Sequence, residues 1–182
     1  MSEIGNDAFF EELYGQVEIK VLTGLMNSLT VEECNIREEA RMRTYGRYFG
    51  ENKIDRKKYE ESLERILKNP ANVTFTNPHD FLLAERALKE QGYLEPSMKE
   101  QMQHEIEHMN KARELGFIEP SIGFYFHDTK EGDFKIQYFC NPGHLPPNMP
   151  DKEIIMALKE ITTAPTKLSP GDANVLAIKS NK

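Results

Sequence analysis

Three residues within a five-residue stretch, His104, Glu105 and His108, have the types and the spacing of a metal-binding site. Residues four positions apart lie one turn apart on the same side of an α-helix, because the helix has about 3.6 residues per turn. Both imidazoles can therefore reach one metal ion, and the carboxylate between them is a candidate general base. The stretch predicts a metal centre on a helix.

The predicted helix over 98–116 also determines the surroundings of these side chains. At about 100° per residue, Glu105 falls on the apolar stripe, with His108 about 60° and His104 about 100° away on one flank. A carboxylate held against apolar side chains loses hydration, which raises its pKa or requires a partner. Such a position suits a general base or a carboxylate linked to a metal. The stripe consists of Met98, Met102, Ile106 and Met109.

The stretch 104–108 resembles the HExxH motif of the zinc metallopeptidases, and the resemblance covers these five residues only. It implies that His104 and His108 bind zinc and that Glu105 activates a bound water molecule. It therefore implies a zinc-dependent hydrolase with peptidase-like activity. Two features depart from the family. The extended metzincin motif has Gly and His where this chain has Lys111 and Glu114, and the clear predicted strands follow the motif helix instead of preceding it.

Spacing alone does not assign the third metal ligand. His144 is the leading candidate, because it lies four residues after Cys140 in a Pro-rich loop, and this loop and the end of the hairpin can close over the motif helix. If Cys140 and His144 both joined the two motif histidines, the site would be four-coordinate, closed and structural. Three other residues suit the role less well. Glu114 is too far along the helix, His127 is expected at the surface, and His79 is expected in a helix cap.

Two alternatives to a hydrolase remain open at this point. Glu105 and His108 also match the E-x-x-H pattern of ferritin-like di-iron bundles, but the chain contains no second E-x-x-H. The other alternative is a non-enzymatic interaction or assembly protein of helical character, with or without a structural metal. An aromatic hairpin with a solvated face and an open edge would provide its docking surface.

Composition narrows the classes of partner. The 182 residues carry a formal net charge of −7, whereas a nucleic-acid or anionic-membrane surface needs a basic face. No apolar run approaches the roughly 18 residues of a membrane span, and the N-terminal residues do not have the pattern of a secretory signal. Cys34 and Cys140 lie far apart in the sequence, which favours reduced thiols. We therefore expect a cytoplasmic protein.

Hydrophobic periodicity predicts a mainly helical first two-thirds of the chain. Helices are expected over about 7–28, 31–50, 55–68, 78–92 and 98–116. Thr30 and Glu33 form a capping-box pattern, and Asn77 followed by proline marks another helix start. Gly92 and Gly116 are predicted to end the last two of these helices.

The remaining third has a mixed pattern. Ser121–His127 and Phe134–Cys140 alternate as strands of a hairpin, with Tyr125 on the predicted wetter face. Asp151 is expected to cap one further helix, and Val175–Ile178 to form a third strand. The sequence thus predicts an α+β fold, in which a small antiparallel hairpin or sheet with one C-terminal helix packs on the helical part. We expect a single domain over 1–182, helical over about 6–116 and mixed over about 117–179.

Overall fold

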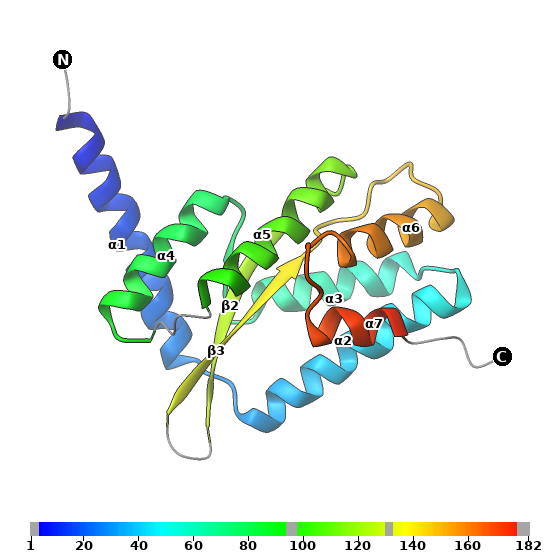
Figure 1. Cartoon of the computed structure of the whole chain (residues 1–182), viewed down its shortest axis with the longest axis horizontal. Helices are drawn as coiled ribbons and strands as arrows, with labels where there is room; N and C mark the ends of the chain where they lie inside the picture. The colour runs from blue at the N-terminus through cyan, green and yellow to red at the C-terminus, as the bar shows by residue number, and fades with distance from the viewer. Residues whose placement is uncertain (1–3, 94–97, 130–132, 178–182) are drawn as a thin grey trace.

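The structure is a computed structural model that describes residues 4–93, 98–129 and 133–177. Within these residues the fold is α+β, as predicted, with seven helices and one three-stranded antiparallel sheet (Figure 1). The elements are α1 Ile4–Met26, α2 Val31–Glu51, α3 Arg56–Lys68, β1 Asn72–Phe75, α4 Pro78–Glu90, α5 Met98–Glu114, β2 Ser121–Asp128, β3 Phe134–Asn141, α6 Asp151–Thr162 and α7 Pro170–Ala177.

Local sequence explains where most helices begin and end. Thr30 accepts a hydrogen bond from the Glu33 backbone N–H, and the Glu33 carboxylate accepts one from the Thr30 backbone, so the predicted capping box starts α2. Asn77 caps α4. Gly92 and Gly116 follow α4 and α5 with φ of 78° and 82°, a left-handed conformation that glycine adopts at low cost.

Three sequence predictions are wrong in detail. Residues 72–75 form strand β1, which the prediction lacked and which precedes the motif helix. The run that begins at Val175 lies in helix α7, not in a strand, so two helices follow the hairpin instead of one; Ile178 falls outside the described residues. Asp151 is the first residue of α6, and Pro150 occupies the cap position without a side-chain hydrogen bond. A short apolar run fits a strand or a buried helix equally well, which explains the α7 error.

Helices cover both faces of the sheet, whose strand order is β1-β2-β3. Ile122, Phe124 and Phe126 of β2 face α1, α4 and α5 across the first core cluster. The opposite face, predicted to be wetter, is covered by α2. Arg37 of α2 lies 4.8 Å from the centre of the Tyr125 ring and donates a hydrogen bond to Asn72 of β1. Tyr125 is therefore only 5% exposed, which corrects the prediction.

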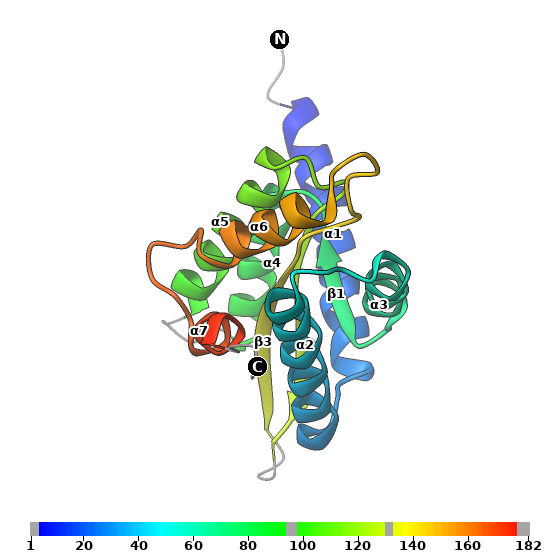
Figure 2. The same ribbon diagram turned by 90° about the vertical axis from the view of Figure 1, so that its right-hand side faces the viewer.

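Helix α5 joins the two hydrophobic clusters of the molecule. Met102, Ile106 and Met109 belong to the first cluster, with the sheet, α1 and α4, whereas Ala112 belongs to the second, with α2, α3, α6 and α7. In two orthogonal views α2 and α7 lie side by side, and so do α5 and α6 (Figures 1 and 2). This packing brings the start of α7 and the end of α6 to the flank of α5 that carries the motif histidines.

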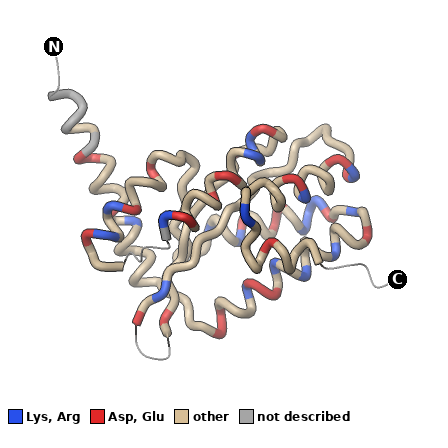
Figure 3. Tube along the Cα trace, viewed as in Figure 1, with Lys and Arg blue, Asp and Glu red and all other residues tan. Residues whose placement is uncertain are grey.

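Charged residues are distributed along the helices without a face of one sign in the view shown (Figure 3). Most ion pairs join residues three or four apart on one helix, such as Arg47 with Glu51 at 2.9 Å. Among the described residues, no helix is long and apolar enough to cross a membrane.

Candidate metal site

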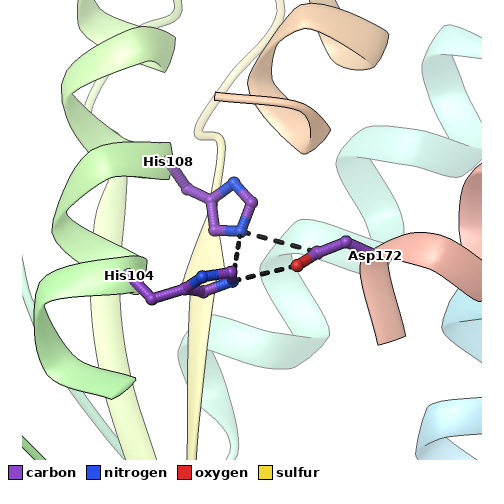
Figure 4. Close-up of side chains that lie close together, drawn as sticks. All are labelled: His104, His108 and Asp172. Atoms are coloured by element: carbon purple, nitrogen blue, oxygen red, sulfur yellow. Dashed lines mark hydrogen bonds and ion pairs between the residues drawn. The ribbon is translucent and has the colours of Figure 1, made fainter. Parts of the chain in front are cut away.

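The two motif histidines lie side by side on α5, as their spacing predicts. His104 Nε2 and His108 Nε2 are 3.0 Å apart, and the ring centroids are 4.6 Å apart at nearly a right angle (Figure 4). Their side chains are 15% and 6% exposed, so both imidazoles are largely shielded from water. The helix thus presents two nitrogen donors toward one point.

Asp172 of α7 supplies a carboxylate at the same point. One carboxylate oxygen lies 2.9 Å from His104 Nε2, and the other lies 3.4 Å from His108 Nε2 (Figure 4). The side chain of Asp172 is 9% exposed. His104, His108 and Asp172 are the group of potential metal ligands that the described part of the chain brings together.

A local hydrogen-bond pattern positions Asp172. Ser169 precedes α7, its Oγ accepts a hydrogen bond from the Asp172 backbone N–H, and its own backbone N–H donates to the Asp172 carboxylate at 3.1 Å. This reciprocal pairing is a capping box in which Asp replaces the usual Glu. The turn that starts α7 therefore also aims the Asp172 carboxylate at α5.

A backbone contact orients the His108 ring. His108 Nδ1 lies 2.7 Å from the carbonyl oxygen of Ile161 in α6. A carbonyl can only accept, so Nδ1 carries the proton, and Nε2 of the neutral ring has a lone pair directed at His104 and Asp172. An imidazole held in this way by a backbone carbonyl has the orientation typical of metal-ligating histidines.

The geometry of the three donors fits a small cation. Donors about 2.0–2.1 Å from a tetrahedral metal ion lie about 3.3 Å from one another. Two of the observed separations are within about 0.4 Å of that value: 2.9 Å from His104 Nε2 to one Asp172 oxygen, and 3.0 Å between the two Nε2 atoms. With one ligand atom taken from each residue, all three atoms lie within 4.8 Å of one another. A lone pair facing a carboxylate is unfavourable unless a proton or a metal ion lies between them. The site is therefore built to hold positive charge.

The acid–base behaviour of the metal-free site follows from the same contacts. Burial lowers the pKa of His108, but the hydrogen bond to Asp172 and the charge of Glu105 outweigh it, so the net pKa is raised. Burial raises the pKa of Asp172, but hydrogen bonds from His108 and Ser169 dominate and hold it well below the usual value. Without metal, a proton is thus retained between these two side chains.

Glu105 lies next to the cluster and is partly buried. Burial raises its pKa, as its position on the apolar stripe predicts, and the neighbouring His108, His104 and Arg41 charges only partly oppose this effect. Glu105 is not one of the three clustered ligands. The general-base role of Glu105 stays a prediction from the sequence.

His144 lies elsewhere and does not join the cluster. Its Nδ1 is 2.7 Å from the Glu60 carboxylate, and its backbone pairs with Ile118. Glu60 also accepts a hydrogen bond from the Leu145 backbone N–H, so this contact fixes the Pro-rich loop. Cys140 is likewise outside the cluster. The residue that lies with His104 and His108 is therefore Asp172, and not His144, which the sequence analysis favoured as the third ligand.

Sequence reasoning missed Asp172 although one indication was present. The sequence analysis expects a strand from Val175 and no helix around Asp172, yet Ser169 followed three residues later by an acid is a helix-start pattern. Recognising the helix would have placed Asp172 in its first turn. It would not have shown that Asp172 reaches the two histidines of α5.

Comparison of the chain with known protein families, curated proteins and solved structures finds no match.

Proposed function

We propose that this protein is a metal-dependent hydrolase in which His104, His108 and Asp172 bind one divalent metal ion. The observation that carries the proposal is the convergence of three shielded donor side chains, whose ligand atoms all lie within 4.8 Å of one another. Two imidazoles and one carboxylate suit zinc, the metal that the motif implies. The same donor types also bind ferrous iron, so metal analysis decides between them.

Three protein ligands are typical of catalytic metal sites, which leave a coordination position for water or substrate. A bound divalent ion would act as a Lewis acid and lower the pKa of a coordinated water molecule. Glu105 would then accept the proton of the attacking water, because burial keeps its pKa closer to neutral than that of an exposed glutamate. The HExxH resemblance favours an amide bond as the bond that is cleaved.

A structural metal site in a non-enzymatic protein is the second candidate. It is supported by the low exposure of the ligands, 15% for the His104 side chain and 6–9% for the other two. A metal ion at this position would link α5 to α7, and metal binding to such a site contributes directly to folding. In this case Glu105 would have no chemical role.

Metal analysis of the full chain without a histidine tag tests both candidates. We expect about one equivalent of zinc or iron in the purified protein, and a loss of most of it in H104A, H108A and D172A. The matched control is H144A, which removes a histidine outside the cluster and should keep its metal. Less than about a tenth of an equivalent in the wild-type protein, with no uptake from added zinc, would refute the metal site.

The variant Glu105→Gln separates catalysis from structure. It removes the base and leaves the three ligands, so the protein should keep its metal and its melting temperature while losing peptide hydrolysis by about 100-fold or more. Hydrolysis would be measured on a mixture of short peptides by mass spectrometry. If E105Q and wild type give the same products at the same rate, or neither cleaves any peptide, the structural role is favoured.

A further inference from the structure

Arg41 of α2 lies beside the metal site with unused hydrogen-bonding capacity. Its Nε is fully buried and has no partner among the described residues. The nearest acid, Glu38, lies 3.8 Å from Nη2, which is too far for a hydrogen bond. A buried donor without a partner costs about 1–3 kcal/mol, so such groups often mark a place where a ligand completes the structure.

The guanidinium of Arg41 faces the start of α7. Nη2 is 3.4 Å from the position that a Cβ atom would occupy on Gly171, the residue before Asp172. The negative charges of Glu38, Glu105 and Asp172 keep the pKa of Arg41 raised although its burial lowers it. Arg41 therefore lies close to both the carboxylate ligand and the predicted base.

The metal site and Arg41 would attract the same anionic group of a ligand. Two neutral imidazoles and the Asp172 carboxylate leave a divalent ion with a net charge of about +1, which an ionised Glu105 beside the site would offset, and Arg41 adds a positive charge nearby. Glu38 offsets Arg41 only in part at 3.8 Å. An anionic group between the metal ion and the guanidinium would be attracted by both cations.

We propose that Arg41 binds a carboxylate group of the ligand, so that this carboxylate lies between the guanidinium and the metal ion. Arginine suits the role because its planar group donates two parallel hydrogen bonds to a carboxylate. Amide hydrolysis generates a carboxylate from the acyl half of the substrate, so the product of the proposed reaction contains the required group. The inference rests on the proposed metal site and assigns the ligand class to it.

Acetate binding to the cobalt(II)-substituted full-length protein tests the inference, with the visible absorption of Co²⁺ as the readout. We expect acetate to change the spectrum of the wild-type protein, and R41M to weaken acetate binding roughly tenfold or more. R41K keeps the charge but loses the paired hydrogen bonds, so its acetate affinity should lie between those of the wild type and R41M. R43M is the matched control, because Arg43 is exposed, lies on the same helix and pairs with Glu39 at 3.0 Å.

The outcomes separate this inference from the proposed function. If the wild-type protein fails to bind Co²⁺, the metal site itself is refuted. If Co²⁺ binds but R41M and wild type have equal acetate affinities, the Arg41 inference is overturned and the metal site stands. The Arg41 inference is also overturned, and the metal site stands, if acetate leaves the Co²⁺ spectrum of the wild type unchanged. Circular dichroism checks the fold of R41M, and if this variant does not fold, an unchanged affinity in R41K overturns the inference instead.

Discussion

At the scale of single residues, the chemistry of the site depends on what each donor contacts on its other side. His108 is held by the Ile161 carbonyl through Nδ1, and Asp172 is held by Ser169, so the atoms that face each other are fixed by neighbours outside the group. These supporting contacts orient ligands as they do in known metal sites. In metal-free protein, the pKa of each of these side chains also depends on the partners that it contacts.

The pKa of His108 in metal-free protein provides a test at this scale. The hydrogen bond and the charge of Asp172 raise this pKa, so D172N should lower it toward or below its ordinary value of about 6.5. Imidazole chemical shifts followed by NMR from pH 5 to pH 9 with chelator present would measure the change. E60Q is the control, because Glu60 contacts His144 and not His108. An unchanged His108 titration in D172N would show that the pair is not coupled.

The two motif histidines could be placed from the sequence because a separation of four residues is a property of the helix itself. Asp172 could not be placed in this way, because it is 68 residues from His104 and its position depends on how α7 packs. His144 was favoured on proximity in sequence to the hairpin end, but its loop is fixed instead by Glu60. Helix periodicity thus predicted that His104 and His108 lie together on α5, but it could not predict that Asp172 of α7 lies beside them.

At the scale of elements, α7 is the most informative helix. It has eight residues, and a helix this short is unstable without capping and tertiary packing. Ser169 starts the helix and holds the Asp172 carboxylate through the same side chain. The cap of α7 and the position of the Asp172 carboxylate are therefore one structural feature.

S169A tests whether the cap of α7 serves the metal site. Loss of the cap should lower the free energy of unfolding by about 1 kcal/mol, and it should also weaken zinc binding because Asp172 loses its orientation. The matched control is T30A, which removes the capping box of α2 and should cost a similar free energy without weakening zinc binding. Urea denaturation and zinc titration against a chromophoric chelator measure the two quantities. Equal zinc affinities in S169A and T30A would contradict the link.

Sheet elements were predicted less completely than helices. The hairpin strands alternate apolar and polar residues and so could be recognised, whereas β1 has four residues between a helix stop and a helix start and resembles a loop. The prediction that one face of the hairpin is wetter was wrong for a different reason. Strand alternation does not indicate whether a helix from another part of the chain covers the second face, and here α2 does so through Arg37 and Tyr125.

At the scale of the whole molecule, the site is where α5 meets the two consecutive C-terminal helices α6 and α7. His104 and His108 come from α5, the Ile161 carbonyl from α6 and Asp172 from α7, and α5 itself belongs to both hydrophobic clusters. Metal binding to these groups would stabilise the folded state as a whole, because the unfolded chain does not bring them together.

The pH dependence of stability should therefore have opposite slopes with and without metal. The pKa of Asp172 is lowered on folding, so its contribution is present above about pH 4 and is lost as the pH falls through the folded value. The pKa of His108 is raised, so its contribution is complete below about pH 6.5 and is lost as the pH rises through the folded value. Metal-free protein should thus lose stability as the pH rises above about 6.5.

The added stability from zinc should increase over the same pH interval, because zinc requires neutral imidazoles and competes with protons for them. Urea denaturation at pH 6, 7 and 8, with either a chelator or a small excess of zinc, measures both slopes. H108Q lacks the titrating ring and should remove most of the pH dependence of the metal-free protein. A zinc stabilisation that is equal at pH 6 and pH 8 would mean that zinc does not displace a proton from these histidines, and the proposed ligand set would then be wrong.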